Sequence, residues 1–168
     1  KKLGNRAIVV VEKFSEFDAV LEVAERLDIE PSIGVRMRPS TRGAGRWEGS
    51  TGDRSKFGLS AQEIVDGIDL LRARGKLHCL ELLHFHIGSQ VSAIRAFKSV
   101  LREAARLYVE LRKLGAPITI VDVGGGLGVD YDGSRSNFPS SVNYTVSEYA
   151  ADIVGALQSA CEEHDQPH

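Results

Sequence analysis

The sequence predicts an α/β fold in which four consecutive βα units form about half of a TIM-type (β/α)8 barrel. Apolar runs beginning near residues 7, 33, 78 and 118 have the composition of buried strands. A helical pattern of apolar residues follows each run, and this alternation favours a parallel sheet. A flavodoxin-like open sheet is the alternative architecture. Four units do not close a barrel and the chain begins without methionine, so we expect a piece of a longer protein.

The composition is that of a soluble globular domain. The chain has 168 residues, of which 42% are hydrophobic and 26% charged, with a formal net charge of −2. Lysine and arginine are scattered, which argues against a nucleic-acid partner. No apolar run approaches the roughly 20 residues that span a membrane. Cys79 and Cys161 lie far apart, and we expect both to be reduced and buried in a cytoplasmic protein.

The first two units carry clear start signals. We expect a strand over residues 7–12 and a helix beginning at Ser15, where a Ser-x-x-acid pattern reaches Asp18. A second strand over residues 33–38 is stopped by a proline. Residues 40–58 are rich in Gly, Ser and Arg. This loop is too long for an ordinary connection, and loops of this kind are often functional.

The later helices have the stronger signals. Ser60 with Glu63, and Thr145 with Glu148, form capping boxes ahead of the second and fourth helices. The third helix has apolar residues at alternating spacings of three and four, at Ile94, Phe97, Leu101, Ala104, Tyr108 and Leu111. The fourth helix is expected to bury a stripe made of Tyr149, Ala150, Ile153, Val154, Leu157 and Cys161.

Two histidines lie near the end of the third expected strand, residues 78–87. Because side chains alternate along a strand, four of its residues are expected to share one face: Leu80, Leu82, His84 and His86. The pair could be packed core residues, a zinc pair with His-x-His spacing, or a shelf on which a cofactor ring rests on His86. No third ligand lies nearby in sequence, so no metal site is predicted. Gly88 and Ser89 follow and supply donors for an anion.

A glycine-rich stretch follows the fourth expected strand, residues 118–123. One face of this strand is expected to carry Ile118, Ile120 and Asp122, and a carboxylate ending an apolar strand needs a partner. The next three residues, Gly124, Gly125 and Gly126, allow the backbone to approach a phosphate and to direct N–H groups at it. The pattern matches neither the dinucleotide fingerprint nor a nucleotide-triphosphate loop. In a barrel both strand ends lie at the carboxyl face, where barrel enzymes work.

Several charged residues lie near these strand ends and have two interpretations each. Arg36 is either a fixed cation near the site or a structural partner of carboxylates. Lys56 is either an active-site loop cation or a solvated lysine. Asp130 and Tyr131 either contact a substrate or make a turn with Gly133.

With these motifs in hand, the chain resembles the bacterial biosynthetic arginine decarboxylases, pyridoxal-phosphate enzymes of the alanine racemase-like, fold type III barrel group. The resemblance spans the whole chain. His-Ile-Gly-Ser-Gln at residues 86–90 and Gly-Gly-Gly at 124–126 are shared with diaminopimelate and ornithine decarboxylases. The loop at 40–58 and the run Gly-Leu-Gly-Val-Asp-Tyr at 126–131 look specific to the arginine enzymes.

The resemblance implies a role for individual residues. His86 matches the histidine that stacks on the pyridine ring, while Arg36 and Lys56 match an arginine and a loop lysine of the active site. The matches to the phosphate site are Ser89, Gly124, Gly125 and Gly126. The implied substrate contacts are Asp122, Gly128, Asp130 and Tyr131. The implied reaction is decarboxylation of L-arginine to agmatine and CO₂, in putrescine and spermidine biosynthesis, with pyridoxal 5'-phosphate as the cofactor.

The resemblance also implies parts that residues 1–168 lack. The lysine that forms the Schiff base would precede residue 1, the acid that pairs with the pyridine nitrogen would follow His168, and a C-terminal β domain would be absent. We therefore expect a partial pyridoxal-phosphate-binding barrel domain that is inactive alone. The family implies a cytoplasmic homo-oligomer and suggests Mg²⁺.

Other functions remain open at this point. The first is a non-catalytic pyridoxal-phosphate-binding barrel protein, which would need neither the loop at 40–58 nor the residues after the glycines. The second is a phosphosugar-type barrel isomerase, in which the two histidines would act as acid and base. Within the decarboxylases, another basic amino acid such as diaminopimelate or ornithine is the alternative substrate.

Overall fold

The computed structural model describes residues 4–40, 56–92, 94–131, 133–136 and 141–167. Its strands form one parallel sheet in the order β1 (Val9–Val11), β2 (Ile33–Met37), β3 (Leu80–Phe85) and β4 (Ile120–Asp122). The α-helices that follow these strands in turn are α1 (Glu16–Arg26), α2 (Ala61–Ala73), α3 (Ile94–Lys113) and α4 (Val146–Glu163). A short 3₁₀ helix, η3 (Leu77–Cys79), precedes β3.

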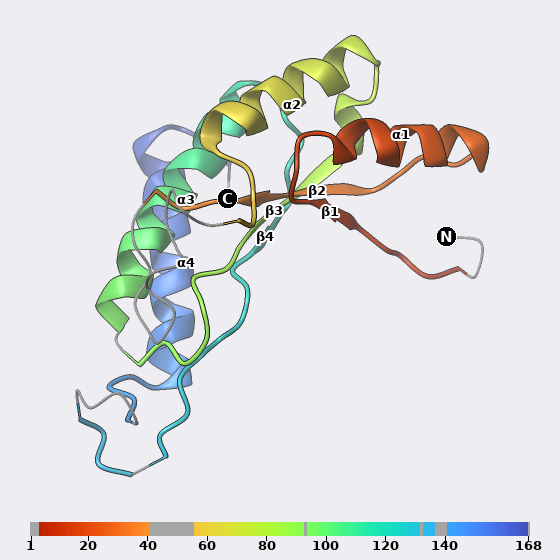
Figure 1. Ribbon diagram of the computed structural model, residues 1–168. Coiled ribbons are helices and arrows are strands. Elements are labelled where there is room, and N and C mark those ends of the chain that lie inside the picture. Colours follow the sequence, from red (N-terminus) through yellow and green to blue (C-terminus); the bar gives the residue numbers. More distant parts are fainter. Residues whose placement is uncertain (1–3, 41–55, 93, 132, 137–140, 168) are drawn as a thin grey trace.

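The predicted series of four βα units with parallel strands is confirmed. In Figure 1 the helices lie along the upper and left side of the sheet, and none of the helices in the described residues covers the opposite side. We call these the helix side and the open side of the sheet. Among the described residues, no helix combines the length and apolar character needed to cross a membrane. Most of the predicted loop, residues 41–55, lies outside the described part of the chain.

The two predicted capping boxes are present. At the start of α2, Ser60 Oγ accepts a hydrogen bond from the Glu63 N–H at 3.3 Å, and Glu63 Oε2 accepts one from the Ser60 N–H at 2.8 Å. Thr145 and Glu148 form the same pair at the start of α4. These reciprocal bonds satisfy N–H groups that a helix cannot pair internally, which fixes where each helix begins.

The predicted cap at Ser15 is wrong in its chemistry, although α1 begins where expected. Ser15 has helical backbone angles and its side chain makes no capping bond. The first N–H groups of the helix, those of Glu16 and Phe17, bond the carbonyls of Lys13 and Phe14 instead, at 2.9 and 3.2 Å. The Glu16 side chain turns back to the segment before the helix, where its Oε2 accepts hydrogen bonds from the N–H groups of Glu12 and Lys13 at 2.7 and 3.1 Å. A carboxylate in the first turn also interacts favourably with the helix dipole.

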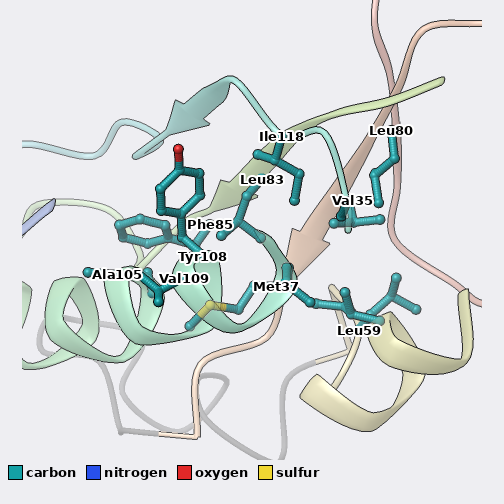
Figure 2. Packing of buried hydrophobic residues seen from close by; sticks show 14 of the residues in the cluster. Val35, Met37, Leu59, Leu80, Leu83, Phe85, Ala105, Tyr108, Val109 and Ile118 are labelled. Carbon is teal, nitrogen blue, oxygen red and sulfur yellow. The ribbon is translucent and has the colours of Figure 1, made fainter. Parts of the chain in front are cut away.

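The hydrophobic core lies on the helix side of the sheet. Figure 2 shows Val35 and Met37 of β2 together with Leu83 and Phe85 of β3, near residues of α3 that include Ala105, Tyr108 and Val109. The alternate residues of these strands therefore point to the open side. This parity decides which residues can form a site.

Two of the predicted strand faces need correction. Ile33 pairs with Leu80 but Gly34 pairs with Leu82, so Glu81 is an extra residue that shifts the register. Leu80 therefore packs in the core and does not share a face with the histidines. Ile118 was expected beside Ile120, yet it precedes β4 and is fully buried in the core.

The predicted stripe of α4 is only partly buried. Tyr149 and Cys161 belong to the core, but Val154 is 63% exposed and Ala150 is also exposed. Both cysteines are free thiols and buried, as predicted.

Candidate functional site

A row of polar side chains crosses the open side of the sheet near the carboxyl ends of the strands. In the strand register, Arg36 of β2 lies beside His84 of β3, and His84 lies beside Asp122 of β4. Glu12, which follows β1, completes the row through its contact with Arg36. Neighbouring residues of a parallel sheet point to the same face, so the register itself brings together residues that are far apart in sequence.

Arg36 is held by two groups. Its Nη1 lies 2.6 Å from Oε1 of Glu12, and its Cζ lies 5.4 Å from the centre of the Phe57 ring. Phe57 reaches this position because Leu59 pairs with the end of β2, where its N–H donates to the Arg36 carbonyl at 2.8 Å. Both sequence interpretations of Arg36 therefore have support, since it is a structural partner of a carboxylate and also a fixed cation near the histidines.

Asp122 has the partners that its position required. Its Oδ2 lies 3.1 Å from Nδ1 of His84, and its Oδ1 accepts a hydrogen bond from the Gly124 N–H at 2.8 Å. The Nδ1 of His84 is buried, and no described group meets it with hydrogen-bond geometry. A small rotation of either side chain would turn the short contact into a hydrogen bond. Asp122 thus connects the histidine of β3 to the glycine stretch after β4.

His86 lies just beyond β3 and is half-buried. Its Nδ1 accepts a hydrogen bond from the Gly88 N–H at 3.0 Å. A backbone N–H can only donate, so this bond assigns the ring proton to Nε2. Burial lowers the pKa of His86, and electrostatic interactions with Arg36 and His84 lower it further, while Asp122 acts in the opposite direction. The imidazole is therefore neutral near pH 7 and fixed in one tautomer.

The glycine stretch packs against the segment that follows β3. A Cβ atom on Gly124 would lie 2.5 Å from the Phe85 carbonyl oxygen and 3.3 Å from Cδ2 of His86. A Cβ atom on Gly126 would lie 1.8 Å from the Gly88 carbonyl oxygen and 3.3 Å from Cα of Ser89. Both glycines have positive φ angles, +71° and +83°. Glycine is needed at both positions because two backbone segments approach each other closely there. Sequence reasoning had explained these glycines by the approach of a phosphate.

Gly125 differs from its two neighbours. A Cβ atom added there would meet no atom within 4 Å, and the residue is exposed. Ser89 is exposed as well and lies against the same stretch. The structure thus brings together His86, Ser89 and the three glycines at one edge of the sheet. Within this group, Gly125 is the position that faces open space.

Gln90 and Tyr144 fasten the two segments together, and sequence reasoning assigned no role to Tyr144. The Gln90 side chain bonds both the N–H and the carbonyl of Val129, at 3.0 and 2.7 Å. The Tyr144 hydroxyl donates to the Val91 carbonyl at 2.6 Å and accepts from the Gly128 N–H at 3.1 Å. Only its spacing from the motif, 16 residues after Gly128, was visible in the sequence, and that spacing carries no recognisable signal.

The remaining predicted substrate contacts have less support from the geometry. A Cβ atom on Gly128 would lie 2.6 Å from a methyl of Val142, so this glycine is a packing position. Asp130 accepts a hydrogen bond from the Gly133 N–H at 3.0 Å, which is the turn that the sequence left open as the alternative. Tyr131 is 76% exposed, and Lys56 is exposed beside Phe57. The contact of Tyr131 with a substrate and the role of Lys56 as a loop cation of the active site stay predictions.

The comparison with known families agrees with this arrangement. Residues 3–168 match the family described as "Pyridoxal-dependent decarboxylase, pyridoxal binding domain". The chain belongs to this family. The site at the carboxyl edge of the sheet is therefore part of a pyridoxal-binding domain.

The chain is similar in sequence to curated arginine decarboxylases. The chain is 51% identical over 168 residues to the biosynthetic arginine decarboxylase of Neisseria meningitidis serogroup B, of which it covers 27%. It is 53% identical over 167 residues to that of Gloeobacter violaceus, of which it covers 26%. The chain thus spans about a quarter of the length of these relatives.

Solved structures give the same fold. The biosynthetic arginine decarboxylase of Campylobacter jejuni superposes with a TM-score of 0.82 at 34% identity, over 98% of this chain and 26% of that one. Diaminopimelate decarboxylase of Helicobacter pylori, complexed with L-lysine, gives a TM-score of 0.72 at 26% identity, over 90% of this chain and 36% of that one. The predicted fold class, part of a TIM-type barrel, is confirmed.

Proposed function

We propose that this chain forms the part of the cofactor site that binds the pyridine ring and the phosphate in a pyridoxal-phosphate-dependent enzyme. This enzyme decarboxylates L-arginine to agmatine and CO₂. The observation that carries the cofactor part of the proposal is the neutral, fixed imidazole of His86 beside the open position at Gly125. The likeness of the whole chain to arginine decarboxylases, at 51–53% identity, supports the choice of substrate.

The residues present fit the cofactor in two respects. A neutral imidazole with one hydrogen-bonded nitrogen offers a flat face to an aromatic ring, and Gly124 packs against its edge. The phosphate would lie at Gly125 and Ser89, where the chain leaves space and where small residues allow backbone N–H groups to approach an anion. Gly124 and Gly126 would act indirectly, by holding the two segments together.

When bound, pyridoxal phosphate would supply an electron sink that takes up the electrons left on the substrate when the bond to the carboxyl group breaks and CO₂ leaves. His86 would hold the ring and exclude water from one of its faces. Arg36, paired with Glu12, would provide a fixed positive charge on the open side of the sheet. Asp122 would position His84 and the glycine stretch through its two contacts.

The domain assignment extends the proposal beyond this chain. The chain covers 26–27% of its arginine decarboxylase relatives, so we infer that the covalently linked lysine, the acid that pairs with the pyridine nitrogen and a C-terminal β domain come from the rest of the polypeptide. Residues 1–168 alone would then form no agmatine. A role for Lys56 as a loop cation of the active site, and contacts of Asp122, Asp130 and Tyr131 with the substrate, belong to the same proposal.

Further features rest on the family resemblance alone. These are a role in putrescine and spermidine biosynthesis, a homo-oligomeric assembly in the cytoplasm, and a requirement for Mg²⁺. Sedimentation of the intact protein and assays after removal of divalent cations would test the assembly and the metal requirement.

The test of the function is a substrate panel with the intact protein. Arginine, ornithine, lysine and diaminopimelate are each supplied with pyridoxal phosphate, and CO₂ and amine products are measured. The proposal expects agmatine from arginine and at least tenfold lower turnover of the others. Preferred turnover of another amino acid would move the protein to a different decarboxylase. Cofactor binding without any turnover would favour the non-catalytic pyridoxal-phosphate-binding barrel protein. Absence of cofactor binding would favour the phosphosugar-type isomerase.

A further inference from the structure

A second cluster of reactive side chains lies at the opposite end of the sheet from His86. The carboxylate of Glu30, the imidazole of His78 and the thiol of Cys79 each offer one atom, and the three atoms lie within 4.8 Å of one another. Glu30 Oε2 is 2.8 Å from His78 Nε2 and 3.2 Å from Cys79 Sγ. Glu30 precedes β2, and the other two residues belong to η3, just before β3.

The three atoms have the chemistry of a zinc site. Thiolate and imidazole ligands suit Zn²⁺, whereas Mg²⁺ prefers an all-oxygen set. Zinc bonds of about 2.0–2.3 Å in a tetrahedron separate the ligand atoms by roughly 3.3–3.7 Å. The two shorter separations here, 2.8 and 3.2 Å, are close to that range. A shift of about half an ångström per side chain would therefore accommodate the ion.

The surroundings hold the ligands in place and leave an entry path. Lys76 Nζ lies 2.5 Å from Oε1 of Glu30, so the ammonium takes one carboxylate oxygen and leaves the other directed at His78 and Cys79. Such outer partners commonly orient metal ligands. The thiol lies in the core, with Cys79 only 5% exposed, while the His78 and Glu30 side chains are 61% and 57% exposed. An ion can thus reach the thiol from solvent.

The Glu30 carboxylate is charged throughout the physiological range. Hydrogen bonds from Lys76, Cys79 and His78, in decreasing order of effect, lower the pKa of Glu30 to about 2.

We propose that Glu30, His78 and Cys79 bind one Zn²⁺ ion, with water in the fourth position. The ion would tie the segment before β2 to the turn before β3. It would act on the framework of the sheet, because the length of β3 separates it from His86. Sequence reasoning had predicted no metal site because no third ligand lies near His84 and His86. It did not consider this cluster, in which Glu30 lies 48 residues from His78.

The test is a titration of the intact, metal-free protein with Co²⁺, which substitutes for Zn²⁺ and gives a near-ultraviolet absorption band when a thiolate binds it. The proposal expects a band that Cys79→Ser abolishes and that Cys161→Ser, the matched control at the other cysteine, leaves in place. His78→Ala should weaken Zn²⁺ binding at least tenfold. Because His78 is exposed, this variant keeps the core intact even if Cys79→Ser lowers stability.

Two outcomes would overturn the proposal. The first is a Co²⁺ spectrum that is the same in the wild type and in Cys79→Ser, or that lacks the thiolate band. The second is a Zn²⁺ affinity that His78→Ala leaves unchanged. Either result would leave the three side chains as a hydrogen-bonded network that joins the starts of two strands.

Discussion

Replacing Gly126 and Gly125 by alanine should separate loop packing from cofactor binding. At Gly126 the added Cβ atom would lie 1.8 Å from the Gly88 carbonyl oxygen, in a backbone with φ of +83°. At Gly125 the same atom would meet nothing within 4 Å. The two neighbouring substitutions are chemically identical, so any difference between them reports the local geometry.

The expected cost at Gly126 has two parts. A left-handed conformation costs alanine about 1–2 kcal/mol, and overpacking against a backbone oxygen costs typically about 1–3 kcal/mol. Because the Gly88 segment can shift, we expect a total of about 2–4 kcal/mol, which corresponds to roughly 30- to 800-fold in a local opening equilibrium. Gly125→Ala should leave that equilibrium within about threefold of the wild type, because the added methyl meets nothing.

Hydrogen exchange and cofactor titration together measure these effects in the intact protein. Without cofactor, peptides covering residues 86–92 and 124–129 should exchange hydrogen faster in Gly126→Ala than in the wild type. In Gly125→Ala the exchange rates of the same peptides should equal those of the wild type. Gly125→Ala should instead weaken pyridoxal phosphate binding, because the methyl occupies the space assigned to the phosphate. The reasoning is refuted if both variants exchange like the wild type, or if Gly125→Ala binds the cofactor normally.

Four further predictions concern His86, Asp122 and a helix cap. His86→Ala should release pyridoxal phosphate, measured by equilibrium dialysis, more readily than His86→Phe, which keeps a flat ring; equal loss in both variants would speak against stacking. The lowered pKa of His86 means that the folded state binds fewer protons than the unfolded chain, so stability should fall as pH drops below about 6.5. Thermal unfolding at pH 7.5 and 5.5 should show a larger loss for the wild type than for His86→Phe, and an equal loss would contradict this assignment. Asp122→Ala should weaken cofactor binding by up to about tenfold more than Asp122→Asn, because asparagine keeps an acceptor for the Gly124 N–H. Identical cofactor titrations of the two variants would show that this hydrogen bond does not support cofactor binding. Ser60→Ala should cost about 1 kcal/mol in urea unfolding by removing the cap on Glu63, whereas an unchanged midpoint would argue against the capping box.

Local signals in the sequence were sufficient for most of the elements. The capping boxes at Ser60 and Thr145 are complete within four residues, and the spacing of apolar residues in α3 is determined by the helix itself. The prediction of a cap at Ser15 failed because the first N–H groups of the helix, those of Glu16 and Phe17, bond the backbone carbonyls of Lys13 and Phe14, and the Ser15 side chain makes no capping bond.

Features that depend on pairing between strands were not accessible in the same way. Alternation along a single strand cannot reveal that Glu81 is an extra residue, so it placed Leu80 on the wrong face. The row that joins Arg36, His84 and Asp122 depends on register across three strands. Sequence reasoning singled out each of the three residues separately and could not place them side by side.

The glycines illustrate how a correct location can have an incomplete explanation. Their small size predicted an anion site, and the three residues do lie beside His86 and Ser89. Yet two of them serve the contact between backbone segments, in which Gly124 approaches Phe85 and Gly126 approaches Gly88. Sequence alone could not separate these roles, because both require the absence of a Cβ atom.

The most direct test of the account is a crystal structure of the intact protein with pyridoxal phosphate bound. We predict the pyridine ring stacked on His86 at about 3.5 Å, the usual separation of carbon atoms in contact, with the phosphate beside Gly125 and Ser89. The Gly88 N–H should still bond Nδ1 of His86. A cofactor bound elsewhere in the protein, or a phosphate remote from Gly125, would contradict the central claim.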